Sequence, residues 1–135
     1  MCLFAHIAAG ALVGAHAPSP YWAPLLGMGS HVALDIVPHY DFESVNLQLM
    51  LGIVMLAIVA AANGLDLSIL LGSLFAALPD FENLLWRKGI ITDERKVFPG
   101  HAGIIPHGRE TGPENVLLQV AFSILVVIYL VRRSS

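Results

Sequence analysis

The sequence predicts an all-helical, polytopic transmembrane bundle, because three of its properties agree. Of its 135 residues, 56% are hydrophobic and only 13% are charged, whereas soluble domains carry about 25% charged residues. The apolar residues fall into five segments separated by Pro, Gly and Asn breakers. The longest segments can cross a hydrocarbon core of roughly 30 Å as helices. We therefore expect a single membrane-embedded domain, residues 1–135, with about five apolar helices.

The first apolar segment, residues 3–17, is short for a membrane span. Gly10 and Gly14 form a GxxxG pattern in Ala-rich surroundings, which favours close packing against another helix over contact with lipid. Residues 15–17 have the small-x-small form of a signal-peptide cleavage site, but no Lys or Arg precedes the apolar stretch. We therefore expect this segment to be retained and to pack inside the bundle.

The second and third segments differ in length and polarity. The second, residues 22–37, ends at Pro38 and carries polar residues, so it can be buried, tilted or only partly inserted. The third, residues 45–63, is followed by Gly64 and is long enough to span the membrane. We expect the third segment to be a secure span.

The last two segments flank the main polar stretch of the chain. We expect the fourth, residues 66–79, to end at Pro79, and the fifth, residues 115–131, to span the membrane. The polar loop between them, residues 87–113, holds five of the seven basic residues. The positive-inside rule places this loop in the cytoplasm, although two arginines at 132–133 then lie on the opposite side.

The chemically capable side chains are expected to converge at one end of the bundle. If all five segments cross, the N-terminus, the turn at 38–44 and the loop at 80–114 share one face of the membrane. His16 falls on the other face, and we interpret it as structural. The face with the loop receives His6, His31, Asp35, His39, Asp41, Asp80, Glu82, His101 and His107.

Imidazoles and carboxylates without thiolates suit a divalent metal, with zinc the leading candidate and manganese or iron as alternatives. His31, Asp35 and His39 are spaced four apart, so they share one helical face until Pro38 disturbs the last turn. Ionisable residues at membrane depth are costly and are normally paired or metal-bound. The pattern favours an open catalytic metal centre.

Each candidate also has a structural interpretation. His31 and Asp35 can form a hydrogen-bonded pair inside a bundle. His101 and His107 can belong to an ordinary solvated loop, and His6 can be a buried histidine bonded to a carbonyl. The convergence of all of these residues at one end favours the metal centre over the separate structural roles.

Four motifs carry a resemblance to a known family. They are HIAAGALVG at 6–14, GSHVALDIVPHYDF at 29–42, GSLFAALPDFENLL at 72–85 and FPGHAGIIPHGR at 98–109. In them the chain resembles a family of small inner-membrane metal-dependent hydrolases of bacteria and archaea, which is distantly similar to zinc-dependent phospholipase C and to fungal single-strand nucleases. The resemblance implies zinc and hydrolysis. Motif and pattern together give as metal ligands His6, His31, Asp35, His39, Asp80, His101 and His107.

The chain departs from the commoner family pattern at two points. Phe81-Glu82-Asn83 stands where Asp-x-Asp-His is frequent, and His101-Ala102-Gly103 stands where His-Arg-Gly is frequent. One acid and one histidine of the pattern are thus missing. The number of metal ions is left open by these differences.

We expect a phosphoesterase-like hydrolase of the cell inner (cytoplasmic) membrane, which acts on a lipid or lipid-linked substrate through metal-activated water. Asp41 or Glu82 would be the catalytic base, and membrane lipid the partner. The alternative is a metal-binding or proton-coupled membrane transport component, and a third interpretation is a non-catalytic scaffold. The net charge of −3 and the lack of a long basic run give no reason to expect a nucleic-acid partner.

Overall fold

The computed structural model describes residues 1–98, 100–104, 108 and 111–134. These residues form five α-helices and one short 3₁₀-helix, with no strand among them, so the predicted all-helical fold is confirmed. In chain order the elements are α1 (Leu3–Ala15), α2 (Ala23–Ile36), α3 (Val45–Asn63), α4 (Leu67–Arg87), η1 (Asp93–Arg95) and α5 (Asn115–Ser134).

Three helices in the described part of the chain, α3, α4 and α5, are long and apolar enough to cross a membrane. Helices α1 and α2 contain 13 and 14 residues. At 1.5 Å per residue they rise about 20 Å, which is less than the hydrocarbon core of roughly 30 Å. Length and composition therefore support three candidate spans, where the sequence predicted about five.

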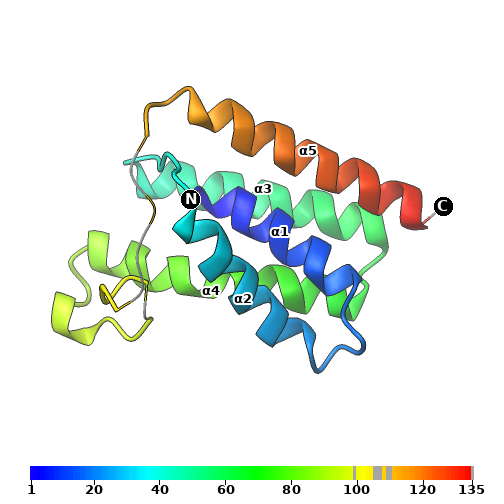
Figure 1. Ribbon diagram of the computed structural model, residues 1–135, viewed down its shortest axis with the longest axis horizontal. Coiled ribbons are helices and arrows are strands. Elements are labelled where there is room, and N and C mark those ends of the chain that lie inside the picture. Colours follow the sequence, from blue (N-terminus) through cyan, green and yellow to red (C-terminus); the bar gives the residue numbers. More distant parts are fainter. Residues whose placement is uncertain (99, 105–107, 109–110, 135) are drawn as a thin grey trace.

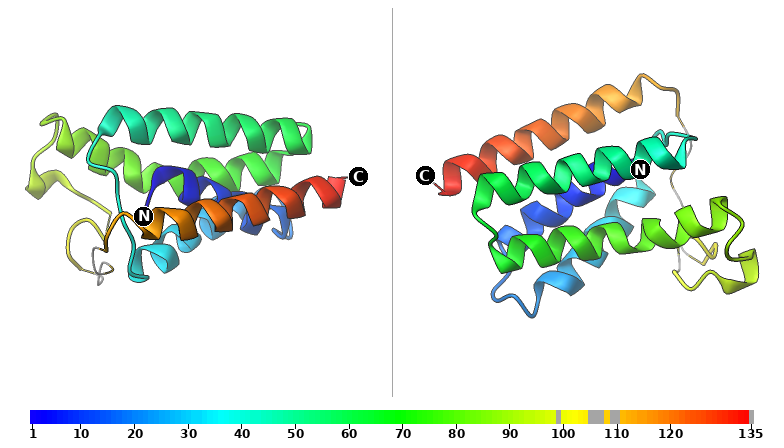
Figure 2. Two further views of the ribbon diagram at one scale, coloured as in Figure 1. Left: turned by 90° about the horizontal axis from the view of Figure 1, so that it is seen from above. Right: turned by 180° about the vertical axis from the view of Figure 1, so that it is seen from behind.

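Helix α1 lies at the centre of the bundle, with the other helices around it (Figures 1 and 2). Eleven of its 13 residues are buried, and it contacts each of the other α-helices. In contrast, large apolar side chains of α3 and α5 are exposed: Ile53 by 68%, Leu117 by 73% and Leu125 by 66%. This inside-out distribution is expected of a bundle whose outer helices contact lipid.

The start of α1 is capped by two buried glutamines from neighbouring helices. The backbone N–H of Cys2 donates to Oε1 of Gln119 over 2.9 Å, and that of Leu3 donates to Oε1 of Gln48 over 3.0 Å. The first N–H groups of a helix have no partner within it, and leaving them unpaired in apolar surroundings is costly. Helices α3 and α5 are thereby tied to the same end of α1.

Helices α1, α2 and α4 cross with their backbones in contact at Gly72. A Cβ on Gly10 would overlap the carbonyl oxygen of Gly72 and lie 2.6 Å from Cβ of Ala76, and a Cβ on Gly27 would overlap the same oxygen. A Cβ on Gly14 would overlap the carbonyl oxygen of Ser68. The GxxxG pattern of the first segment therefore packs against α4, as predicted.

The fourth helix extends beyond the predicted boundary. The sequence predicted an end at Pro79, but α4 continues to Arg87, so the polar connection begins at residue 88. Pro79 cannot donate to the carbonyl four residues earlier, and neighbouring helices compensate for such losses in apolar bundles. Beyond Pro79 the helix is held by Leu84, which is buried against Leu3 and Ile7 of α1.

Successive helices alternate in direction, so the N-terminus, the connection at 37–44 and the described residues of the connection between α4 and α5 lie at one end of the bundle (Figure 1). The predicted convergence of the polar segments is therefore confirmed. His16 lies at the opposite end, where its Nε2 is 2.8 Å from the hydroxyl oxygen of Tyr129. This contact agrees with the structural interpretation of His16.

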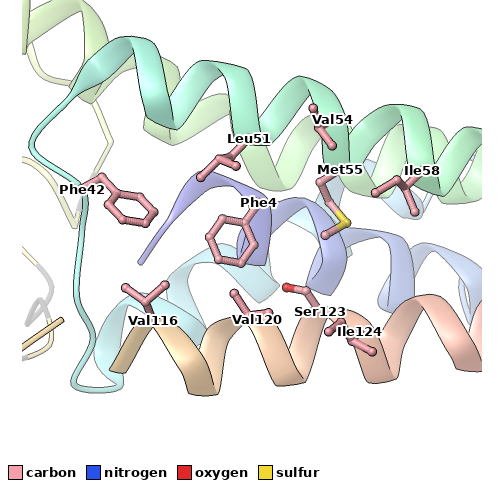
Figure 3. Close-up of a pocket in the computed structure, with 10 residues that line it drawn as sticks. All are labelled: Phe4, Phe42, Leu51, Val54, Met55, Ile58, Val116, Val120, Ser123 and Ile124. Atoms are coloured by element: carbon pink, nitrogen blue, oxygen red, sulfur yellow. The ribbon is translucent and has the colours of Figure 1, made fainter. Parts of the chain in front are cut away.

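An apolar hollow of about 180 Å³ opens between α3 and α5. Figure 3 shows Phe4 of α1 between the two helices, with Met55 and Val120 on either side. At the opposite end of the bundle the two helices are joined by Ser134, whose hydroxyl donates to the carbonyl of Ala62. We refer to the apolar space between these two helices as the α3–α5 hollow.

Replacing Gly72 with alanine is expected to destabilise the protein, because the new methyl group meets the backbone of α1. Overpacking of this kind typically costs about 1–3 kcal/mol. Gly29→Ala is the matched control, since a Cβ there meets open space on α2 and alanine favours a helix by up to about 1 kcal/mol over glycine. Thermal unfolding in detergent should show a lower Tm for Gly72→Ala only; equal values for both variants would contradict the crossing.

Candidate metal centre

Five ionisable side chains meet at the end of the bundle where the polar connections lie. His6 comes from α1, His31 and Asp35 from α2, Asp80 from α4, and His101 from the loop after η1. All five belong to the predicted set of ligands. Side chains that are far apart in sequence are thus brought together by four separate elements.

The glycine crossing determines the register of three of these residues. His6 is one helical turn from Gly10, and His31 is one turn from Gly27. Asp80 lies two turns beyond Gly72. Residues four apart on a helix share a face, so the faces that meet at the glycines also carry the ionisable groups toward one another.

Asp35 lies against both buried histidines. Its Oδ1 is 3.1 Å from Nε2 of His6, and its Oδ2 is 2.9 Å from Nε2 of His31. The two imidazole rings are stacked, with centroids 3.9 Å apart and planes at 20°. His6 and His31 are fully buried. These three residues therefore form a compact cluster without solvent contact at either ring.

Asp80 and His101 extend this cluster. Oδ2 of Asp80 is 3.8 Å from Nε2 of His6, and Nε2 of His101 is 3.8 Å from Oδ2 of Asp35. Candidate ligand atoms of His6, His31 and Asp35 all lie within 4.8 Å of one another, and so do those of His31, Asp80 and His101. Two groups of three potential ligands thus share His31.

A backbone hydrogen bond defines the chemistry of His31. Its Nδ1 lies 2.7 Å from the carbonyl oxygen of Ala76. Because a carbonyl only accepts, Nδ1 carries the proton, and in the neutral ring Nε2 then presents its lone pair. That lone pair faces the carboxylate of Asp35. Two electron-rich atoms 2.9 Å apart in a buried site require a proton or a cation between or beside them.

Other buried atoms of the cluster have the same requirement. Within the described residues, no hydrogen bond reaches Nδ1 of His6 or Oδ2 of Asp80, and the Nε2 atoms of His6 and His31 lie 3.1 and 2.9 Å from the Asp35 carboxylate. Each buried polar atom left without a partner costs about 1–3 kcal/mol. Several such atoms that converge on one place, all of them nitrogen or oxygen donors, fit a divalent cation.

His39 and Asp41 form a neighbouring group. Nε2 of His39 is 3.4 Å from Oδ2 of Asp41, and the amino group of Met1 lies between Asp41 and Asp35, 3.2 Å from the latter. Helix α2 ends at Ile36, before the proline at 38, so His39 does not continue the helical face of the two preceding candidates. The structure does not bring it into either ligand group.

Glu82 anchors the loop that carries His101. Its carboxylate accepts hydrogen bonds from the backbone N–H groups of Val97 and Phe98, and its Oε2 is 3.7 Å from Nδ1 of His101. Phe98 in turn packs edge-on against His31, with ring centroids 5.1 Å apart. Glu82 therefore supports the position of His101 through contacts with the loop.

The last predicted ligand, His107, lies outside the described residues. After it in the chain, the N–H of Gly108 donates to the carbonyl of Asp35, and the N–H of Thr111 donates to the carbonyl of His39. The loop therefore crosses the end of α2. Sequence reasoning missed Gln48 and Gln119, although isolated glutamines within strongly apolar segments are a usable signal.

No family model, no curated protein and no solved structure matches this chain. The likeness of its four motifs to membrane metal-dependent hydrolases therefore stays an expectation. Because fold alone does not define activity, the function has to be argued from the arrangement of the side chains.

The metal centre predicts a specific pattern of metal content. Purified wild-type protein should contain near-stoichiometric zinc or manganese by elemental analysis. His31→Ala and Asp35→Asn should each lose it, because each removes a ligand from the shared cluster. His16→Ala, at the other end of the bundle, should keep it. A wild type without metal after reconstitution, or a His31→Ala variant that retains it fully, would contradict the site.

The stability of the metal-free protein should depend on Asp41 at low pH. Burial raises the pKa of Asp41, but the hydrogen bond from His39 and the nearby amino group of Met1 outweigh it, so the pKa lies below its usual value. A carboxyl group whose pKa falls on folding stabilises the protein above its unfolded-state pKa of about 3.9, and this contribution is lost as the pH falls further.

The test compares Tm for chelator-treated wild type and Asp41→Asn between pH 6 and pH 3. The wild type should be the more stable at pH 6, and the difference should shrink as the pH falls below about 4. A difference that stays constant over this range would show that the ionised carboxylate does not contribute.

Proposed function

We propose that the protein is a membrane-bound, metal-dependent hydrolase that cleaves a phosphoester in a lipid or lipid-linked substrate. The observation that carries this proposal is the close approach of His31 Nε2 to the Asp35 carboxylate, at 2.9 Å. It lies in a buried cluster whose remaining donors are also nitrogen and oxygen. Such a mixed set without thiolates is typical of catalytic rather than structural zinc.

The proposed location is the inner (cytoplasmic) membrane. Helices α3, α4 and α5 have the length and composition of spans. In the proposed topology α1 and α2 also cross, as shorter segments, and the other helices shield α1 from lipid. The connection after α4 carries Lys88, Arg95 and Lys96, which favours the cytoplasmic side. The metal centre would then face the cytoplasm at the membrane surface.

The residues that would hold the metal are His6, His31, Asp35, Asp80 and His101. A divalent cation there would lower the pKa of water toward about 7 and offset charge on the phosphoryl oxygens. The Ala76 carbonyl orients the His31 ring, and Glu82 positions the loop of His101. These contacts fix the donors before substrate arrives, which is a requirement for efficient catalysis.

Asp41 is the proposed general base. Its side chain is 19% exposed, whereas Asp35 beside the histidines is almost fully buried. Asp41 is a carboxylate at neutral pH, which is the form that accepts a proton, and its lowered pKa makes it a weaker base than an ordinary aspartate. Asp41 is held by the amino group of Met1 and by His39, whereas Glu82, the other predicted base, accepts hydrogen bonds from the backbone of the loop that carries His101. We therefore assign Glu82 a positioning role.

The transport alternative is less well supported by the distribution of polar groups. A relay or permeation path needs ionisable groups at mid-depth or on both sides of the membrane. In the described residues the cluster lies at one end, and the buried polar side chains of α3 and α5 are Gln48, Gln119 and Ser123. This arrangement favours surface chemistry over passage through the bundle.

The proposed function predicts different effects for two conservative substitutions. With metal-loaded protein and phospholipid vesicles, Asp35→Asn should lose both metal and phosphoester hydrolysis. Asp41→Asn should keep the metal but lose at least 100-fold in kcat, since general base catalysis contributes about 10²–10⁴. His16→Ala should match the wild type.

The substrates for this test are phosphatidylcholine, phosphatidylglycerol and phosphatidic acid, with release of headgroup or phosphate as the readout. A wild type that holds metal but hydrolyses none of them would contradict the proposed function. Full activity in Asp41→Asn would contradict the assignment of the base alone.

A further inference from the structure

A second apolar hollow, of about 510 Å³, lies along α4 beside the metal centre. Its wall includes Met28 from α2, Leu78, Phe81 and Leu85 from α4, and Val97 and Phe98 from the loop after η1. We refer to it as the α4 groove. Among the described residues that line it, Glu82 is the one with a charged side chain.

The α4 groove adjoins the metal centre through two of its lining residues. Phe98 lines the groove, and its ring contacts both His31 and His101, at centroid distances of 5.1 and 5.3 Å. Glu82 lines it as well and lies 3.7 Å from His101. The groove therefore has an apolar wall along α4, and its Glu82 and Phe98 side adjoins the candidate ligands.

We propose that the α4 groove binds one hydrocarbon chain of a membrane lipid whose phosphate-bearing headgroup lies at the metal centre. The headgroup part of this proposal rests on the proposed function, while the chain site is new. The two ends of the groove match the two parts of an amphiphile: apolar side chains for the chain, and metal ligands for the phosphate.

The size and position of the groove suit this occupant. Its volume lies within the range of roughly 300–1,000 Å³ that is usual for ligand sites. From Leu85 to Leu78 the groove follows α4 for about 10 Å, at 1.5 Å per residue. Because α4 is a candidate span, this direction leads from the end with the polar loop toward the interior of the membrane, as a lipid chain does.

The α3–α5 hollow provides an internal comparison. It is smaller, about 180 Å³, and its described lining contains no charged residue. It has apolar surface without a polar end, so a lipid there would have no reason to place its phosphate in a defined position. Preferential occupation of the α4 groove would therefore reflect the metal centre, and not apolar character alone.

The test uses full-length, metal-loaded protein in phosphatidylcholine vesicles that contain a small fraction of phosphatidylglycerol with a diazirine on one acyl chain. After photolysis, mass spectrometry locates the labelled residues. We expect most of the label on residues 78–85 and 97–98, with little in the α3–α5 hollow. Labelling spread evenly over the exposed faces of α3, α4 and α5 would overturn the proposal.

Two matched substitutions test the site directly. Leu78→Trp fills the groove and should reduce labelling there at least five-fold. Leu74→Trp is the control, because Leu74 lies one turn earlier on α4 with similar exposure, 49% against 52%, and does not line the groove. If Leu78→Trp fails to fold, Met28→Trp fills the groove from α2 and should give the same loss. Unchanged labelling in a folded groove variant would overturn the proposal.

A headgroup control separates a phospholipid site from a general apolar surface. The methyl ester of the same diazirine fatty acid lacks the phosphate and should label the groove several-fold less than the phosphatidylglycerol probe. Equal labelling would overturn the link to the metal centre. Because labelling needs no turnover, the two proposals can fail separately: labelled but inactive protein contradicts the hydrolase, and active protein without groove labelling contradicts the chain site.

Discussion

The contact of three helix backbones at Gly72 is the constraint on which the rest of the structure depends. Side chains larger than hydrogen at Gly10, Gly27 or Gly72 would hold α1, α2 and α4 apart. The consequence reaches the metal centre, because His6 and His31 lie one turn from two of these glycines. A shift of a single helix by a few tenths of an ångström would be transmitted to atoms that are about 3 Å apart. These glycines thus determine the positions of the ionisable side chains, although they contribute no ligand atom themselves.

Because the site is buried, each of its polar and charged groups needs a partner within the protein. A carboxylate in apolar surroundings is stable only when it is paired and hydrogen-bonded, and Asp35 lies between histidines from two helices, which meet that condition when they carry a proton or share a cation with it. The same condition explains the glutamines at the start of α1, which satisfy backbone N–H groups that water cannot reach. The end of the bundle is consequently a polar layer in which each group has its position defined by its neighbours.

Much of the architecture followed from local sequence patterns. Breaker residues separated five apolar segments, and alternation of direction placed His6, Asp80 and His101 at the same end without any knowledge of packing. The length of α4 did not follow, because Pro79 predicts an end unless the contacts of Leu84 with α1 are known. Tertiary contacts of this kind override a local signal and are invisible in one sequence.

Individual roles within the site were harder to predict than its existence. Spacing placed His39 on the face of His31 and Asp35, but α2 ends before it, so the distance along the chain no longer corresponds to helical geometry. Glu82 was predicted as a base because its residue type fits; its hydrogen bonds to the loop backbone depend on a fold of residues 97–98 that has no sequence signature. Residue type indicated the kind of chemistry, but only the geometry separated candidate metal ligands from residues that position the loop.

The capping of α1 by Gln119 also bears on how the protein is made. The two groups that form this hydrogen bond are 117 residues apart, so the N–H of Cys2 has no capping partner until α5 has been synthesised. Until then Gln48 of α3 is the capping side chain at the start of this 13-residue helix. The capping of the central helix is therefore completed late in biogenesis, and the candidate metal ligands can come together once the chain has been made as far as His101.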